Sequence, residues 1–326
     1  MIITEREVFH GFSFLFPVTM ALILPKDRAP GLAKSILTSN LFLQYADIMF
    51  REPELKNKII DAWRVCEKRF PEPKLDWWSN KNTITAPSVT RTDPVMVFLR
   101  ERGLLKPDQH VIDIGCGRGE RVGIFAESAG QVTGLDISPY ACTVAQEHIR
   151  SLHLDNVNII NADFHTFDPV EEGTVRQYVL VFAYNAPVLG CYDSFRKIEI
   201  MSKNACFTSN VLEVKHRFLQ EAAVQVIGKR ARTVHKNQTF LISAFALLSM
   251  EERRPEVTYY EETIYSRISA REKVPSILKK SCREDPVTED EQMQILELLK
   301  DRIDENGTYV EEIHMLSGWL FWKMNL

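Results

Sequence analysis

A run of glycines at alternate positions is the part of the sequence best suited to bind a ligand. The run follows a short apolar stretch, and its members are Gly115, Gly117 and Gly119. Glycine has no side chain, so it adopts turns that other residues avoid and lets a ligand touch the backbone. A strand, a glycine turn and then a helix form the entrance to a nucleotide-type site. The stretch from His110 to Glu120 therefore predicts a cofactor-binding loop.

Aspartates stand at the ends of three successive expected strands. Asp113 lies just before the glycines, Asp136 ends the second strand, and Asp163 follows the third. The carboxyl ends of parallel strands meet at one edge of a sheet, so these carboxylates should lie near one another. A carboxylate at the end of the second strand can accept hydrogen bonds from both hydroxyls of a ribose. These acids therefore favour a ligand that contains a nucleoside.

Two cofactor classes use such a glycine turn, and the spacing separates them. The dinucleotide fingerprint Gly-x-Gly-x-x-Gly requires a glycine where this sequence has Glu120. The stretch from Asp113 to Gly119 instead reads acid-x-Gly-x-Gly-x-Gly. In this it resembles the class I S-adenosylmethionine (SAM)-dependent methyltransferases, and SAM is the cofactor that the resemblance implies.

The resemblance also implies roles for the residues around the turn. Asp113 would lie near the methionine end of SAM, and Asp136 would bind the ribose. Asp163 would contact the amino group of the adenine, with Ile137 or Phe164 against the ring. The expected cofactor-binding residues are Asp113, Gly115, Cys116, Gly117, Gly119, Asp136, Ile137, Asp163, Phe164 and Tyr184.

The loop Tyr184-Asn185-Ala186-Pro187 follows the fourth expected strand and is the candidate for contact with the methyl acceptor. The resemblance places it opposite the methyl group, so Tyr184 and Asn185 are the candidate catalytic residues. It is similar to the Asn-Pro-Pro-Tyr loop of amino-group methylases of nucleic acids, but its aromatic residue precedes the asparagine and the second proline is absent. A nucleobase acceptor is therefore disfavoured. Methyl transfer depends mainly on alignment, and it needs a base only where the acceptor must lose a proton.

The hydrophobic pattern predicts the elements that hold these residues. Strands expected at 111–114, 131–137, 156–161, 178–183 and 205–211 alternate with helices, which predicts a parallel sheet with helices on both faces. The expected fold is α/β: a doubly wound, mostly parallel, seven-stranded Rossmann-like sheet, plus an N-terminal helical segment. The resemblance implies a late antiparallel strand pair.

The last third of the chain gives a less regular pattern. We expect a helix at 213–229, a helix or strand at 239–250, a strand at 257–268 and polar helices near 270–282 and 288–303. One or two strands follow at 309–323, with Gly318 interrupting them. Tyr259, Tyr260 and Glu261 could reach a substrate from the strand at 257–268, although simple alternation along a strand explains them as well.

The chain divides into two expected parts. Residues 1–75 form a helical N-terminal segment, which acts as a cap over the site or as a homodimer surface. Residues 76–326 form the SAM-binding domain, with insertions after residue 211. Trp77 and Trp78, in the connection between them, either fold over a ligand or fix the helical segment to the core.

The composition of the sequence disfavours several classes of binding partner. The sequence is 45% apolar and 26% charged, as in ordinary soluble proteins, and its net charge of −4 disfavours a general nucleic-acid-binding surface. The apolar run from Phe12 to Leu24 is shorter than the ~20 residues that span a bilayer, so we expect a cytoplasmic protein with no membrane partner. Neither the cysteines nor the histidines have the spacing of a metal site, so no metal is expected.

The pattern as a whole predicts a SAM-dependent methyltransferase that acts on a small-molecule acceptor. One alternative is a non-catalytic SAM-binding protein with a regulatory or partner-binding role. Another is an NAD(P)-dependent oxidoreductase, which Asp136 would serve equally well. Glu120 and the absence of a clear Tyr-x-x-x-Lys pair count against the oxidoreductase.

Overall fold

The computed structural model describes residues 53–67, 90–228, 234–235, 238–282 and 285–324. Predictions for residues 1–52 and 68–89, including those for Trp77 and Trp78, lie outside these ranges. The expected boundary near residue 75 falls there too, so the division into two parts stays a prediction. Among the helices in the described ranges, none is long and apolar enough to cross a membrane.

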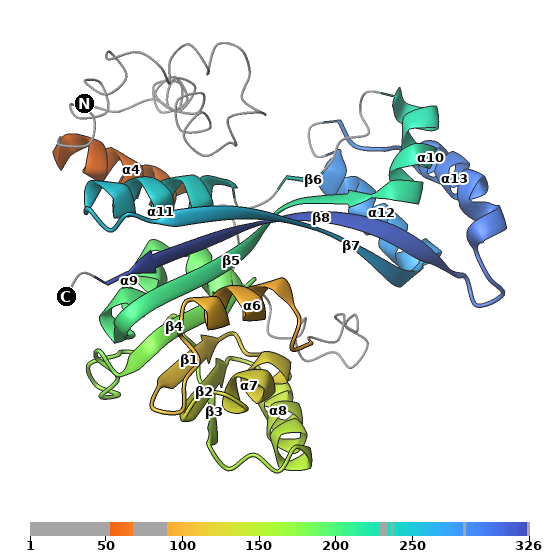
Figure 1. Ribbon diagram of the computed structural model, residues 1–326. Coiled ribbons are helices and arrows are strands. Elements are labelled where there is room, and N and C mark those ends of the chain that lie inside the picture. Colours follow the sequence, from red (N-terminus) through yellow and green to blue (C-terminus); the bar gives the residue numbers. More distant parts are fainter. Residues whose placement is uncertain (1–52, 68–89, 229–233, 236–237, 283–284, 325–326) are drawn as a thin grey trace.

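One twisted sheet has the strand order β3-β2-β1-β4-β5-β8-β7 (Figure 1). Its parallel strands β1 to β5 are His110–Ile114, Gln131–Asp136, Val157–Asn161, Tyr178–Tyr184 and Ser202–His216. Strand β8 (Thr308–Lys323) runs antiparallel between β5 and β7 (Glu256–Ser269). The short β6 (Val234–His235) pairs with β5 beside this path. The mostly parallel seven-stranded sheet and its late antiparallel pair are thus confirmed, with β6 as an addition.

Helices cover both faces of the sheet, as expected. One face carries α6 (Pro94–Glu101), α7 (Glu120–Ala126) and α8 (Pro139–Ser151). Capping residues in the sequence set where two of these helices begin: Asp93 accepts from the Val95 N–H, and Ser138 accepts from the Ala141 N–H. A proline follows each cap at the first helical position, where its fixed φ suits the helix.

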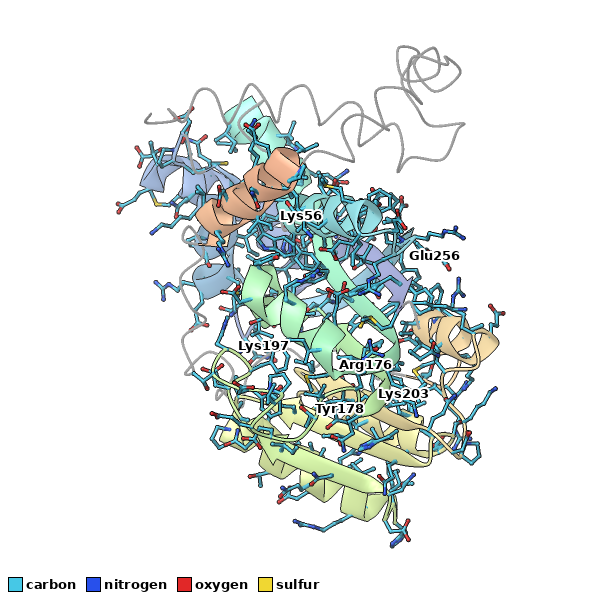
Figure 2. All side chains as sticks on the ribbon, turned by 90° about the vertical axis from the view of Figure 1, so that its left-hand side faces the viewer. Lys56, Arg176, Tyr178, Lys197, Lys203 and Glu256 are labelled. Atoms are coloured by element: carbon cyan, nitrogen blue, oxygen red, sulfur yellow. The ribbon has the colours of Figure 1, made fainter. Side chains whose placement is uncertain are left out.

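The other face carries α4 (Pro53–Glu67), α9 (Tyr192–Met201) and α11 (Gln238–Met250). Figure 2 looks onto this side, with Lys56 on α4 and Lys197 on α9. Lys56 forms an ion pair with Glu251 at the end of α11, at 2.7 Å. Trp63 of α4 is 1% exposed and belongs to the same core cluster as α9 and α11. Helix α4 is therefore packed as part of this layer.

Strands β5, β7 and β8 are long, and their outer ends support a second small core (Figure 1). This distal lobe consists of residues 264–269 and 308–313 of β7 and β8 together with three helices. The helices are α10 (Arg217–Ile227), α12 (Ala270–Ser281) and α13 (Glu289–Leu299). Their buried apolar side chains form a cluster separate from the two that flank the rest of the sheet.

Two predictions for the last third of the chain are wrong in detail. The helix expected from residue 213 begins at Arg217, because Glu213 to His216 pair with β8 and prolong strand β5. Gly318 does not interrupt β8. A Cβ added there would lie 2.7 Å from Leu241 Cδ2 and 2.9 Å from Leu212 Cδ1, so the glycine admits α11 against an unbroken strand.

Candidate functional site

The glycines of the turn have three different surroundings. All have positive φ: +75° at Gly115, +55° at Gly117 and +78° at Gly119. A Cβ on Gly115 would lie 3.0 Å from Ala186 Cβ, and one on Gly119 would lie 3.0 Å from Ala145 Cβ. A Cβ on Gly117 would meet nothing within 4 Å. The outer glycines therefore allow close packing, while Gly117 borders open space where a ligand can approach the backbone.

Asp136 lies beside this space with its carboxylate held in a fixed orientation. Its Oδ2 accepts the Gly117 N–H and its Oδ1 accepts the Ser138 N–H, each at 2.9 Å. Asn161, at the end of β3, donates to the carbonyl oxygens of Asp136 and Ile137 at 2.9 and 3.0 Å. Each carboxylate oxygen can accept a further hydrogen bond. The arrangement suits a ribose with two adjacent hydroxyls, and Asn161 is a supporting residue that sequence analysis missed.

Asp113 and Arg121 lie on the other side of the turn. Asp113 is 3% exposed, and burial raises its pKa to about 7, with Arg121 opposing the rise and Asp136 adding to it. Arg121, in the first turn of α7, has its Cζ 3.8 Å from the centroid of the Tyr184 ring and a terminal nitrogen 3.7 Å from Asp93. Among the described residues its buried Nε has no hydrogen-bond partner. Sequence analysis missed Arg121, although its place two residues after the last glycine was a usable signal.

The remaining expected cofactor-binding residues differ in which of their atoms a ligand could contact. Asp163 turns back on its own loop and accepts the His165 N–H at 2.9 Å. Phe164 is 3% exposed and packs in the core against Phe167, with ring centroids 5.9 Å apart. Cys116 is 8% exposed, and its Sγ would lie 2.9 Å from a Cβ at Gly134. The side chains of Phe164 and Cys116 thus point inward, so a ligand could meet only their backbone.

The two candidate catalytic residues, Tyr184 and Asn185, are tied to β5. Asn185 has a φ of +55°, a left-handed conformation that asparagine adopts more readily than most residues other than glycine. Its N–H donates to the Ser209 carbonyl at 2.8 Å, and the Ser209 hydroxyl donates to its Oδ1 at 3.3 Å. Burial raises the pKa of Tyr184 to about 12, although Arg121 and Ser209 oppose the rise. Tyr184 therefore stays protonated at neutral pH and cannot serve as a base there.

Successive side chains of β7 point to opposite faces of the sheet, so only every second residue of this strand lies on the same face as the site. Tyr260 lies opposite Ser317 in the β7–β8 ladder, and its ring stacks on Trp319 at 5.0 Å. Glu262 lies two residues further on the same face, while Glu261 points to the opposite side of the sheet. Burial raises the pKa of Glu262, as does Asp93, while Arg121 lowers it. Sequence analysis named Tyr260 and missed Glu262.

These residues form one group, which we call the polar cluster. Its members are Asp93, Arg121, Tyr184, Tyr260 and Glu262. They come from the N-cap of α6 and from α7, β4 and β7, and their charges act on one another: Asp93 and Glu262 both raise the pKa of Tyr184, which Arg121 lowers. The cluster adjoins the glycine turn at the carboxyl ends of the strands.

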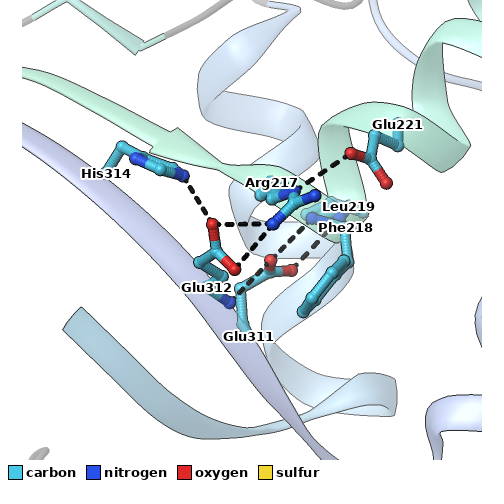
Figure 3. A network of polar contacts seen from close by, with 7 residues as sticks. All are labelled: Arg217, Phe218, Leu219, Glu221, Glu311, Glu312 and His314. Carbon is cyan, nitrogen blue, oxygen red and sulfur yellow. Dashed lines mark hydrogen bonds and ion pairs between the residues drawn. The ribbon is translucent and has the colours of Figure 1, made fainter. Parts of the chain in front are cut away.

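A surface groove of about 690 Å³ lies elsewhere, beside the distal lobe, and is lined in part by Lys215, Arg217, Glu312 and His314. Figure 3 shows the last three of these residues in a network of polar contacts. Glu312 accepts from Arg217 at 2.9 Å and pairs with His314 Nε2 at 2.9 Å. Arg217 also pairs with Glu221. Because these charges neutralise one another, the groove is a weaker candidate for a functional site than the edge beside the glycine turn.

Comparison with protein families gives a match over most of the fold. A family model described as a methyltransferase domain matches residues 105–298. A probable cobalt-precorrin-6B C(15)-methyltransferase (decarboxylating) from Methanobrevibacter smithii is 31% identical over 80 residues, 24% of this chain and 42% of that protein. A ubiquinone biosynthesis O-methyltransferase from Coxiella burnetii is 26% identical over 106 residues, 31% of this chain and 44% of that protein. The chain thus spans less than half the length of these relatives.

The crystal structure of a putative methyltransferase from Bacillus halodurans matches with a TM-score of 0.41 and 14% identity, over 70% of this chain and 97% of that one. The two curated relatives act on different acceptor atoms, carbon and oxygen by their names, so the comparisons leave the acceptor open.

Proposed function

The chain belongs to the SAM-dependent methyltransferase-domain family, and from that premise we propose that it transfers a methyl group from SAM to a small-molecule acceptor. The observation that carries the proposal is the Asp136 carboxylate, oriented by the Gly117 and Ser138 N–H groups beside an open glycine turn. A dinucleotide enzyme would also want such a carboxylate, but Glu120 stands where its third glycine belongs. The family match favours SAM over that alternative.

Each part of the site has a role in this proposal. Asp136 binds the ribose hydroxyls, the turn at Gly117 receives the methionine end, and Asp163 with Ile137 contacts the adenine. Asp113 and the unpartnered Nε of Arg121 provide charge for the amino and carboxylate groups of the methionine end. When bound, SAM supplies a methyl group on a sulfonium, which is a good leaving group. The protein's part is then to orient the acceptor, for which Tyr184 and the fixed Asn185 are placed at the end of β4.

The acceptor is proposed as a small molecule for two reasons. The net charge of −4 gives no general attraction for nucleic acid, and the loop from Tyr184 to Pro187 departs from the nucleobase-methylase pattern. A homodimer formed through residues 1–75 stays a prediction.

The test compares two glycines that share a backbone conformation and differ in location. Gly117 and Gly173 have φ of +55° and +66°, and an added Cβ meets nothing within 4 Å at either. Gly117→Ala and Gly173→Ala should therefore cost similar stability, about 1 kcal/mol from the left-handed conformation. Only Gly117→Ala should weaken SAM binding, by about tenfold or more, because its methyl occupies the space that a ligand would fill. Calorimetry measures the affinity and thermal unfolding the stability.

Transfer itself is tested with SAM labelled on its methyl group and a protein-free metabolite extract. With SAM held below its Kd, label should enter a small molecule at similar rates with the wild-type protein and with Gly173→Ala, and about tenfold more slowly with Gly117→Ala. Equal SAM affinity in both variants would refute the assignment of the turn. SAM binding without transfer to any metabolite would instead favour the non-catalytic alternative.

A further inference from the structure

The loop after β3 presents one free hydrogen-bond acceptor and one free donor side by side. Oδ1 of Asp163 accepts the His165 N–H at 2.9 Å, and its Oδ2 has no hydrogen bond to any described residue. The Phe164 N–H likewise has no acceptor in the described part of the chain. Adenine carries the matching pair on one edge, because its amino group donates and the ring nitrogen beside it accepts. The loop is therefore suited to the role that the proposed function gives Asp163.

Lys197 of α9 holds this loop through two of its carbonyl groups. The lysine Nζ donates to the Phe164 carbonyl oxygen at 3.1 Å and to the His165 carbonyl oxygen at 2.6 Å. Ser194, one turn earlier on α9, has its hydroxyl 3.5 Å from Nδ1 of His165. Lys197 forms no ion pair with a carboxylate in the described part of the chain. Its charge is therefore available to the two loop carbonyls.

The peptide unit between Phe164 and His165 connects the lysine to the Asp163 carboxylate. The carbonyl oxygen of this unit accepts from Lys197, and its N–H donates to Asp163 Oδ1. Because a peptide unit is planar, a contact that fixes its carbonyl also fixes the direction of its N–H. A cation at the carbonyl also polarises the unit and makes the N–H a stronger donor. Lys197 thus acts on the orientation of the Asp163 carboxylate without touching it.

Resting on the function proposed above, we propose that Lys197 is a positioning residue that sets the specificity of the cofactor site for adenine. With the lysine in place, the Asp163 carboxylate and the Phe164 N–H keep the fixed relation that the adenine edge requires. Without it, the Phe164–His165 peptide can rotate, and a base with the reversed pattern of donor and acceptor is rejected less strongly. A lysine that only joined α9 to the loop would affect the binding of both bases equally.

The experiment compares two ligands that differ only on this edge of the base. S-Adenosylhomocysteine is the demethylated product of SAM. In S-inosylhomocysteine a carbonyl oxygen replaces the amino group and the neighbouring ring nitrogen carries a hydrogen, so donor and acceptor are exchanged. Calorimetry with the full chain measures both affinities. We expect the wild-type protein to bind the adenosyl ligand about a hundredfold more tightly.

Three lysine variants test the proposal. Lys197→Met keeps the unbranched length of the side chain and removes the donors, so the preference for the adenosyl ligand should fall by about tenfold. Lys197→Arg should retain the preference, because a guanidinium can donate to both carbonyls. Lys203→Met is the matched control and should behave as wild type. Lys203 is exposed, and its side chain has no hydrogen bond or ion pair with any described residue (Figure 2).

A double-mutant cycle tests whether the lysine acts through Asp163. Asp163→Asn by itself should lower the preference, since an amide in place of the carboxylate removes the charged acceptor. In that background, Lys197→Met should change the preference by less than about twofold, because residues that act through one another are not additive. Full additivity of the two changes would show that Lys197 does not act through Asp163, and would overturn the proposal.

Other outcomes are equally decisive. A Lys197→Met protein that keeps the wild-type preference, or that binds both ligands more weakly by the same factor, would overturn the proposal, with thermal unfolding as the check that each variant is folded. A wild-type protein that binds the two ligands equally would show that Asp163 does not face the amino group, and would overturn it too. A wild-type protein that binds neither ligand would instead refute the proposed function.

Discussion

The distal lobe and the cofactor edge, which is the edge of the sheet beside the glycine turn, differ in how their buried polar side chains are hydrogen-bonded. In the distal lobe, Glu311 is 0% exposed, and its carboxylate accepts the Phe218 and Leu219 N–H groups at 2.8 and 3.1 Å (Figure 3). It also accepts the Tyr309 hydroxyl at 2.8 Å. These are the first-turn N–H groups of α10, whose own cap residue supplies no side-chain bond. The carboxylate therefore caps the helix from a neighbouring strand.

At the cofactor edge, buried polar atoms are left unsatisfied. Arg121, Ser317 and Trp319 each have a buried side-chain atom with no partner among the described residues. Asp113 is buried at a cost that shows in its raised pKa. The Asn185 backbone lies in the left-handed region, which residues other than glycine, asparagine and aspartate rarely adopt.

This difference distinguishes polar groups that stabilise the fold from polar groups that are available to a ligand. A polar group whose bonds are all made inside the protein contributes to stability and specifies a single packing. A buried polar group without a partner lowers stability, and a bound ligand is one way in which such a group can be completed. From this comparison we propose that the distal lobe supports the fold and that the cofactor edge binds the ligand, and mutations can test each proposal.

The largest effect is expected from Glu311→Ala. The change leaves the N–H groups of Phe218 and Leu219 and the Tyr309 hydroxyl buried without their acceptor, so we expect a loss of about 3 kcal/mol in the free energy of unfolding. Urea denaturation measures this loss. Affinity for SAM should stay within about twofold of wild type, because the lobe has its own core.

Glu305→Ala is the control for Glu311→Ala, because Glu305 is exposed in the turn before β8. It should change stability by less than about 0.5 kcal/mol. If folded Glu311→Ala protein loses SAM affinity, the lobe and the cofactor edge are coupled and the division between them fails.

A smaller effect is expected at the cofactor edge from Asp113→Asn, and it depends on pH. The folded pKa of Asp113 is raised to about 7 from an ordinary value of 3.8, so its contribution to stability is fully present below about pH 4 and is lost as pH rises through 7. Over that window, wild-type stability should fall by up to about 1.4 kcal/mol per pH unit from this group. Asp113→Asn should remove that part of the slope.

Denaturation of the ligand-free protein from pH 5 to pH 8 measures the slope. Asp108→Asn, at an exposed aspartate just before β1, is the control and should follow the wild-type curve. Parallel curves for Asp113→Asn and the wild type would show that Asp113 is not strained by burial.

The sequence alone was sufficient for the parallel half of the fold because its signals are local. An apolar run, a glycine turn and the caps Asp93 and Ser138 lie within a few residues of the elements that they define. Asp136 could be placed from its spacing to the turn, and the structure adds which N–H groups orient it.

The parts that sequence analysis missed depend on contacts between distant residues. Glu311 and Phe218 are 93 positions apart, so no local pattern reveals the cap that starts α10. Glu262 joins Tyr184 only through the β5–β8–β7 ladders, whose register follows from the whole sheet. The extension of β5 to His216 has the same cause, because β8 pairs with residues that otherwise match a helical pattern.

The smallest effect tests whether helix α4 belongs with the cofactor edge. The Trp63 Nε1–H donates to the carbonyl of Gly190, the last residue of η1 (Pro187–Gly190), at 2.6 Å. Trp63→Phe keeps an aromatic ring in the core and removes this bond, so stability should fall by about 1 kcal/mol. Because η1 begins two residues after Asn185, amide hydrogen exchange over residues 185–191 should become faster.

Trp322→Phe is the matched control. Trp322 is also 1% exposed, lies in the same core cluster and donates one hydrogen bond, to Glu199 at 3.3 Å. It should cost similar stability and leave exchange over residues 185–191 unchanged. If both variants or neither of them change that exchange, α4 does not specifically stabilise residues 185–191, and its packing contributes to the core alone. A response confined to Trp63→Phe would connect the N-terminal part of the chain to the residues that orient the acceptor.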